Sequence, residues 1–173
     1  MPPARHTAAC LIATLVTLAP FAPAVAGRLF DFRQPPHSYF EHKPNDRLAR
    51  LHLDIAAGKT EIDTSSDRAF LVSMLKALEI PESSQILVFS ATSLQSEIIN
   101  PRNPRALYFN DDTYVGWVPG GRLEVSAIDP EMGPMFYVYE RFTPGRVPVP
   151  ELSTRCFACH AGTATNHVPG LIA

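Results

Sequence analysis

Apolar residues recur at helical spacing in residues 46–57. Leu48, Leu51 and Ile55 fall on one face of a helix drawn through this segment. The spacing predicts an amphipathic helix with one buried side, and Gly58 supplies a stop signal.

A second segment with the same period follows at residues 67–78. Ser66 stands where a helix N-cap is expected, and Pro81 lies beyond the end. The predicted apolar stripe consists of Phe70, Leu71, Met74, Leu75 and Leu78. Two helices are therefore expected before the chain changes its pattern.

From residue 86 onward the pattern is typical of strands. The run at residues 86–89 (ILVF) predicts a buried strand, and residues 93–98 predict a short helical turn. Turn-forming residues such as Asn110-Asp111-Asp112 then separate further apolar or alternating runs. Those runs are residues 106–109, 113–118, 123–127 and 136–142. They predict an antiparallel β-meander with one face on a core.

The last part of the chain is a proline-rich linker at residues 143–155, followed by a short helix at residues 156–161. The predicted fold class is α+β, with two amino-terminal helices, a central antiparallel meander and a short carboxy-terminal helix. The 173 residues suit one domain with an adequate core.

Composition removes some function classes. The net charge is −2, and no basic cluster indicates a nucleic-acid surface. No long apolar run remains after the first 26 residues, so no membrane span is expected in the mature chain.

The most specific motif is Cys156-Phe157-Ala158-Cys159-His160. C-x-x-C-H is the attachment motif of a covalent c-type haem. Two thiols one helical turn apart can add to the two vinyl groups of the porphyrin, and the next residue can offer its imidazole to the iron. We expect Cys156 and Cys159 to bind one haem c per chain, with His160 as the proximal iron ligand.

Other chemistries use the same residue types. The two cysteines could form a tight disulfide, and a zinc site would have to combine them with His160 and His167. A thioredoxin-like motif requires a preceding strand and a long following helix, whereas prolines precede this one and little chain follows it. Haem attachment is the interpretation that also accounts for the start of the chain.

Haem attachment takes place outside the bacterial cytoplasm, so the motif predicts an export signal. Residues 1–26 fit one: Arg5 lies in a short first region, residues 8–18 are apolar, and Ala24-Val25-Ala26 forms a cleavage site. We expect cleavage before Gly27, a periplasmic location, and loss of Cys10 with the signal. Residues 27–173 are then expected to form a single haem-binding domain.

The position of the motif argues against the small cytochrome c fold. That fold is all helical and carries its motif near the mature amino terminus. Here the motif lies near the carboxy terminus, behind a β-rich region.

Two stretches of this chain support a family resemblance. They are residues 84–95 (SQILVFSATSLQ) and 101–112 (PRNPRALYFNDD), the latter continued by Tyr114-Val115-Gly116. With the C-x-x-C-H motif and Val168-Pro169-Gly170, they resemble a family of exported bacterial proteins that have a single carboxy-terminal haem c motif and no established reaction. The resemblance spans residues 44–170 and implies a haem c protein. It also implies relatives that run beyond V-P-G, whereas this sequence stops at Ala173.

The second axial ligand of the haem decides between electron transfer and chemistry at the iron. Thioether or imidazole ligation is possible from six residues, each of which has an ordinary packing or surface role as the alternative. The candidates are Met132, Met135, His37, His42, His52 and His167.

Other side chains are candidates for the haem surroundings. Arg102, Arg105 and Arg155 could pair with the haem propionates, because a guanidinium suits a carboxylate. Aromatic residues of the predicted strands could form the wall of the haem pocket or belong to the core. They are Trp117, Tyr108, Tyr114 and Tyr139.

Two function hypotheses follow. The first is a periplasmic electron carrier that exchanges single electrons with a redox partner protein. The second is a haem enzyme or binder of a small ligand, such as peroxide or a gas, with an open distal site. A distal histidine or arginine paired with a positioned acid would favour the second. A third hypothesis, a thiol–disulfide protein without haem, predicts a colourless product.

Overall fold

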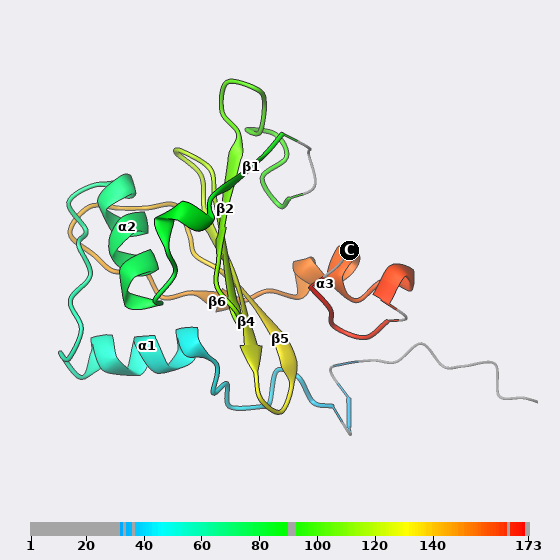
Figure 1. Cartoon of the computed structure of the whole chain (residues 1–173). Coiled ribbons are helices and arrows are strands. Elements are labelled where there is room, and N and C mark those ends of the chain that lie inside the picture. Colours follow the sequence, from blue (N-terminus) through cyan, green and yellow to red (C-terminus); the bar gives the residue numbers. More distant parts are fainter. Residues whose placement is uncertain (1–31, 33, 36, 90–92, 166, 172–173) are drawn as a thin grey trace, which may run out of the picture.

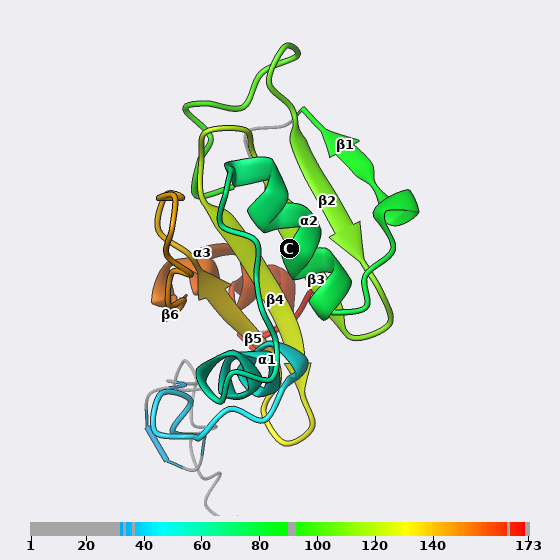
Figure 2. The ribbon, with the colours of Figure 1, turned by 90° about the vertical axis from the view of Figure 1, so that its left-hand side faces the viewer.

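The computed structural model describes residues 32, 34–35, 37–89, 93–165 and 167–171. An antiparallel sheet runs through the middle of the molecule, with the helices α1 (Arg47–Ala56) and α2 (Asp67–Ala77) on one face and the short helix α3 (Phe157–His160) on the other (Figure 1). The perpendicular view places α1 and α2 in front of the sheet and α3 behind it (Figure 2). The predicted α+β class is confirmed. The predicted signal peptide at residues 1–26 lies outside the described residues.

Within the described residues the sheet has six strands, and their order in space is their order in the chain. Each strand pairs antiparallel with the next, so the predicted meander is confirmed. At the first predicted turn the side-chain oxygen of Asn110 accepts hydrogen bonds from the amides of Asp112 (3.2 Å) and Thr113 (2.9 Å). The strands are β1 (Ile86–Val88), β2 (Arg105–Phe109), β3 (Thr113–Trp117), β4 (Leu123–Asp129), β5 (Gly133–Val138) and β6 (Glu151–Leu152).

Both predicted amino-terminal helices are confirmed. They are α1 (Arg47–Ala56) and α2 (Asp67–Ala77). Asp46 caps α1 by accepting from the amide of Ala49 at 3.0 Å, and Ser66 caps α2 by accepting from Ala69 at 3.1 Å. In the part of the chain that the structure describes, no helix has both the length and the apolar character needed to span a bilayer.

Side chains of β4 alternate between the two faces of the sheet. Leu123, Val125 and Ala127 are buried and belong to the same core as the apolar stripe of α2. Glu124 and Ser126 lie between them and therefore point to the opposite face, which carries α3. This face of the sheet, turned away from α1 and α2, is called the free face below.

The prediction of a buried first strand was wrong. Ile86, Leu87 and Phe89 have 51%, 47% and 55% of their surfaces exposed. β1 is the edge strand and pairs with β2 alone, and α2 does not cover it. An unbroken apolar run indicated a strand but could not show that the strand lies at the edge of the sheet.

Three smaller predictions also need correction. Residues 94–98 form hydrogen-bonded turns, in which the amide of Ile98 donates to the carbonyl of Gln95 at 3.1 Å, and this segment is not assigned as a helix. The fifth strand starts at Gly133, earlier than the predicted 136–142, because Asp129 closes a tight turn by accepting from the amides of Glu131 and Met132. β6 lies inside the predicted linker, where Leu152 pairs with Tyr137.

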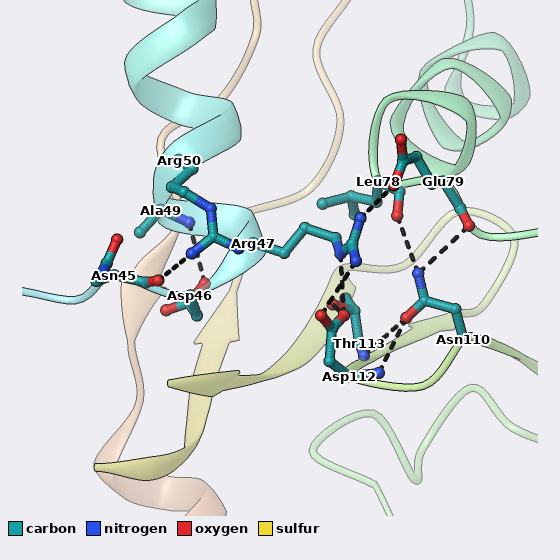
Figure 3. A network of polar contacts seen from close by, with 10 residues as sticks. All are labelled: Asn45, Asp46, Arg47, Ala49, Arg50, Leu78, Glu79, Asn110, Asp112 and Thr113. Atoms are coloured by element: carbon teal, nitrogen blue, oxygen red, sulfur yellow. Dashed lines mark hydrogen bonds and ion pairs between the residues drawn. The ribbon is translucent and has the colours of Figure 1, made fainter. Parts of the chain in front are cut away.

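One arginine links α1, α2 and the turn between β2 and β3 (Figure 3). Nε and Nη2 of Arg47 donate to the two carboxylate oxygens of Asp112 at 2.9 and 3.1 Å, and Nη1 donates to Glu79 at 2.5 Å. Nδ2 of Asn110, in the same turn, donates to the carbonyl of Leu78 at 3.0 Å. The hydrogen bonds from the Arg47 guanidinium hold the pKa of the Asp112 carboxyl below its usual value.

We expect Asp112→Asn to lower the free energy of unfolding near neutral pH by up to about 1 kcal/mol, since it removes one charge of a partly exposed ion pair. The pKa of Asp112 is lower in the folded protein than in the unfolded one. The carboxylate therefore stabilises the fold above the unfolded pKa, and this stabilisation is lost as the pH falls through the folded pKa.

Urea unfolding at about pH 7 and about pH 2 measures both effects. The gap between wild type and Asp112→Asn should close at the acidic pH. Asp111→Asn, at the exposed neighbouring position, serves as the control and should change stability at neither pH. A gap of the same size at both pH values would contradict the ion-pair explanation.

Candidate functional site

The C-x-x-C-H motif lies over the free face of the sheet. A 3₁₀ turn (Thr154–Cys156) leads into α3 (Phe157–His160), so the predicted short helix is present, one residue shorter at each end. Cys156 is half-buried and Cys159 is exposed, and both thiols are free. Burial raises the pKa of the Cys156 thiol, whereas reactive thiols of redox C-x-x-C motifs have lowered values.

Phe157, the second residue of the motif, anchors it to the rest of the protein. Its ring centroid lies 4.8 Å from that of Tyr39, edge to face, and 5.4 Å from that of Phe32. Phe136 of β5 and Phe40 approach it to 5.9 and 6.1 Å. Aromatic pairs at these separations stabilise by more than their buried area alone. Phe157, which lies between the two cysteines, therefore packs the motif against the rest of the protein.

The ring of Tyr39 is held in place by its hydroxyl. The hydroxyl donates to the carbonyl of Pro134 at 3.2 Å and accepts from the amide of Phe136 at 3.0 Å. Burial raises the pKa of the Tyr39 phenol, so the hydroxyl keeps its proton at neutral pH. Phe157 thus packs against a residue that is tied to β5.

His160 is oriented by the segment that follows the motif. Its Nδ1 lies 2.9 Å from the carbonyl oxygen of Gly170, and the amide of Gly170 donates to the carbonyl of His160 at 2.8 Å. A carbonyl can only accept, so in this contact Nδ1 carries the proton and Nε2 has the free lone pair. That tautomer, fixed by a backbone carbonyl, is the one that binds a metal through Nε2. Gly170 of the V-P-G segment therefore fixes the orientation of the His160 ring.

Two hollows open between the motif and the free face. Four residues border both of them: Arg105, Glu124, Cys156 and His160. The space within the hollows, including the part that is open to solvent, measures about 570 and 610 Å³. The first is also bordered by Tyr114, Gly116, Ser126, Phe136 and Leu171, and the second by Ser93, Leu94, Arg155 and Cys159.

A partly buried ion pair borders both hollows. Nη2 of Arg105 donates to Glu124 at 2.6 Å, and the two side chains have 18% and 12% of their surfaces exposed. The guanidinium reaches across β3 at Gly116, where a side-chain Cβ would overlap it. Nε of Arg105 and Oγ of Ser126 are buried and have no hydrogen-bond partner in the structure.

These residues fit a covalently attached haem. The two thiols lie one helical turn apart, His160 can offer Nε2, and the buried unpartnered polar atoms beside the hollow call for a polar partner. The zinc alternative receives no support: the described residues contain no cluster of three or more His, Cys, Asp and Glu side chains arranged for a metal ion.

Two of the candidate distal ligands lie on the opposite side of the sheet from His160. Met135 is fully buried in the core, and Nε2 of His52 is hydrogen-bonded to Tyr139 at 2.5 Å. Burial also lowers the pKa of His52. The structure does not bring these two residues together with His160.

The remaining candidates are placed differently. Met132 packs against the core at the β4–β5 turn, and His42 lies 3.3 Å from Asp129. The ring of His37 lies 5.4 Å from that of Phe32, on the aromatic side of the motif. His167 lies between α3 and Gly170 with a positive φ of 59°. Among the described residues that border the hollows, His160 is the only histidine and there is no methionine.

Of the predicted propionate partners, Arg105 and Arg155 border the hollows, while Arg102 lies exposed in a turn beyond them. Tyr114 borders a hollow, as predicted for a pocket wall. Three other predicted wall residues do not: Trp117, Tyr108 and Tyr139 lie on the helix-covered side.

Sequence reasoning missed Glu124, Ser126, Gly116, Phe136 and the role of Gly170. Glu124 and Ser126 are the polar positions of an alternating strand, and that signal could have identified them. Comparison of the chain with models of known families, with curated proteins and with solved structures found no match. The resemblance to exported haem c proteins therefore stays a prediction.

We expect Phe157→Ala to lower the free energy of unfolding by roughly 2–3 kcal/mol, because it removes a partly buried ring from the aromatic cluster. Urea unfolding followed by tyrosine fluorescence measures this change. Ala158→Ser, at the exposed neighbouring position of the same motif, should leave stability within about 0.5 kcal/mol. Equal stability of the two variants would contradict the anchoring role of Phe157.

Proposed function

We propose that this protein is an exported c-type haem protein of the periplasm that transfers single electrons to a redox partner protein. Cys156 and Cys159 hold the haem through two thioethers, and His160 binds the iron through Nε2. The observation that carries the proposal is the hydrogen bond between Nδ1 of His160 and the carbonyl of Gly170, because it leaves Nε2 ready for a metal.

Electron transfer is the favoured role because it requires only a bound haem with an accessible edge. When bound, the haem supplies a one-electron iron couple. Cys159, one of the two residues that would hold the haem, is exposed, so a partner protein could approach the motif there. The chain contributes the thioethers, the oriented imidazole and the wall of aromatic residues below the motif.

A second candidate function is supported by one specific contact. Arg105 paired with Glu124 beside His160 is the kind of arginine–acid pair expected in a haem enzyme or in a binder of peroxide or a gas. In that case Arg105 would supply a hydrogen-bond donor to the small ligand. The spectrum of the protein distinguishes the two functions.

The first experiment is to express the full chain together with the haem-maturation machinery and to extract it with acidic acetone. We expect colour that survives extraction in the wild type and in the control Ala158→Ser. The double variant C156A/C159A should lose all covalent haem, since both thioether positions are gone. Retention of haem by the double variant, or a colourless wild type beside a control cytochrome that matures normally, would contradict the proposal.

Oxidised and reduced spectra then separate the two functions. Low-spin bands in both states indicate two axial ligands and an electron carrier. High-spin bands that shift with carbon monoxide or peroxide indicate an open site and the second function. In both cases replacing His160 with alanine should change the spectrum, because the proximal ligand is lost.

A further inference from the structure

Buried polar atoms that have no hydrogen-bond partner occur on the free face of the described structure. Nε of Arg105 and Oγ of Ser126 are both buried without a partner, and both residues border the hollow that contains His160. Nearly all buried polar groups in proteins are hydrogen-bonded, so a pair of unpartnered atoms beside one hollow indicates a group that fills it. We propose that Arg105 and Ser126 form a binding site for an oxygen acceptor, either a carboxylate of the haem itself or a small oxyanion.

The donor at Arg105 is already positioned. Glu124 accepts from Nη2 at 2.6 Å and fixes the guanidinium, and Gly116 leaves the space in which it lies. On the edge of the guanidinium formed by Nε and Nη2, the Nε–H group remains without an acceptor. A donor held in advance binds an acceptor more strongly because little side-chain freedom is lost on binding.

Charge supports an acceptor with negative charge. The ionisable side chains around the two hollows include Arg105 and Arg155 as cations and Glu124 as the carboxylate. Because Arg105 is neutralised by Glu124, Arg155, which borders the second hollow and not the first, is left as an exposed positive charge. One further carboxylate or oxyanion would balance it, and charge-assisted hydrogen bonds are stronger than neutral ones.

An unpartnered Nε also occurs at Arg122, so this feature alone does not indicate a binding site. This Nε is also buried without a hydrogen bond, and the nearest carboxylate oxygen, of Glu140, lies 3.6 Å away. Arg122 borders neither hollow. It is therefore the matched control: an arginine with the same unpartnered atom, placed just before β4, that borders neither of the two hollows.

The proposed binding site rests on the proposed function, because it requires a haem beside it. Two measurements distinguish a haem carboxylate from an external oxyanion as the acceptor. The holoproteins of wild type, Arg105→Gln, Ser126→Ala and Arg122→Gln are compared. The first readout is the reduction potential as a function of pH, with nothing added. The second is the affinity of the oxidised protein for nitrite, used as the oxyanion probe.

If the acceptor is a haem carboxylate, removing Arg105 raises the pKa of that carboxylate, because the guanidinium no longer stabilises its charged form. A carboxylate that loses its proton stabilises oxidised iron, so the potential of Arg105→Gln should fall more steeply with rising pH than that of the wild type. If the acceptor is an external oxyanion, the potential profile stays unchanged. Nitrite affinity should then fall by about tenfold to a hundredfold in Arg105→Gln, with a smaller loss in Ser126→Ala.

Either change, seen in Arg105→Gln and Ser126→Ala but not in Arg122→Gln, supports the site. Where Arg105→Gln fails to fold, Ser126→Ala carries both readouts. Holoproteins that match Arg122→Gln in both readouts overturn the binding site and leave the proposed function standing. A wild type without covalent haem overturns the proposed function and this site together.

Discussion

The strict alternation of side chains along β4 is the constraint on which the other features of this protein depend. Val125 and Ala127 are needed in the core under α1 and α2, and this requirement sets the register of the strand. The same register places Glu124 and Ser126 on the opposite face. A shift by one residue would exchange the two sets, so the core and the candidate site cannot vary independently.

The candidate site joins three parts of the chain over this face. The motif contributes the thiols and His160, the segment after it contributes the carbonyl of Gly170, and β2 contributes Arg105. Phe157 fixes the motif to the sheet through aromatic contacts, whereas Arg105 reaches Glu124 because Gly116 has no side chain. Aromatic packing of Phe157 thus positions the motif, and the lack of a side chain at Gly116 leaves the space for the ion pair.

The sequence predicted those features that depend on local pattern. The cap Ser66 and the turn at Asn110 were recognisable because their chemistry acts on neighbouring amides, whereas the predicted first helix included its cap, Asp46. The exposure of Leu87 was not recognisable, since it depends on the place of its strand in the sheet. The pairing of Arg105 with Glu124 depends on strand register, and the bond from His160 to Gly170 depends on where the last segment turns back.

Only a short stretch of backbone pairing connects the motif to the sheet. β6 pairs with β5 through only two residues, Glu151 and Leu152, and beyond it the amide of Ser153 donates to the carbonyl of Phe136. Short pairings of this kind open at a fraction of the free energy that unfolds a whole domain. The carboxy-terminal segment therefore depends on the aromatic contacts of Phe157 with Tyr39 and Phe136, rather than on strand pairing, to stay on the sheet.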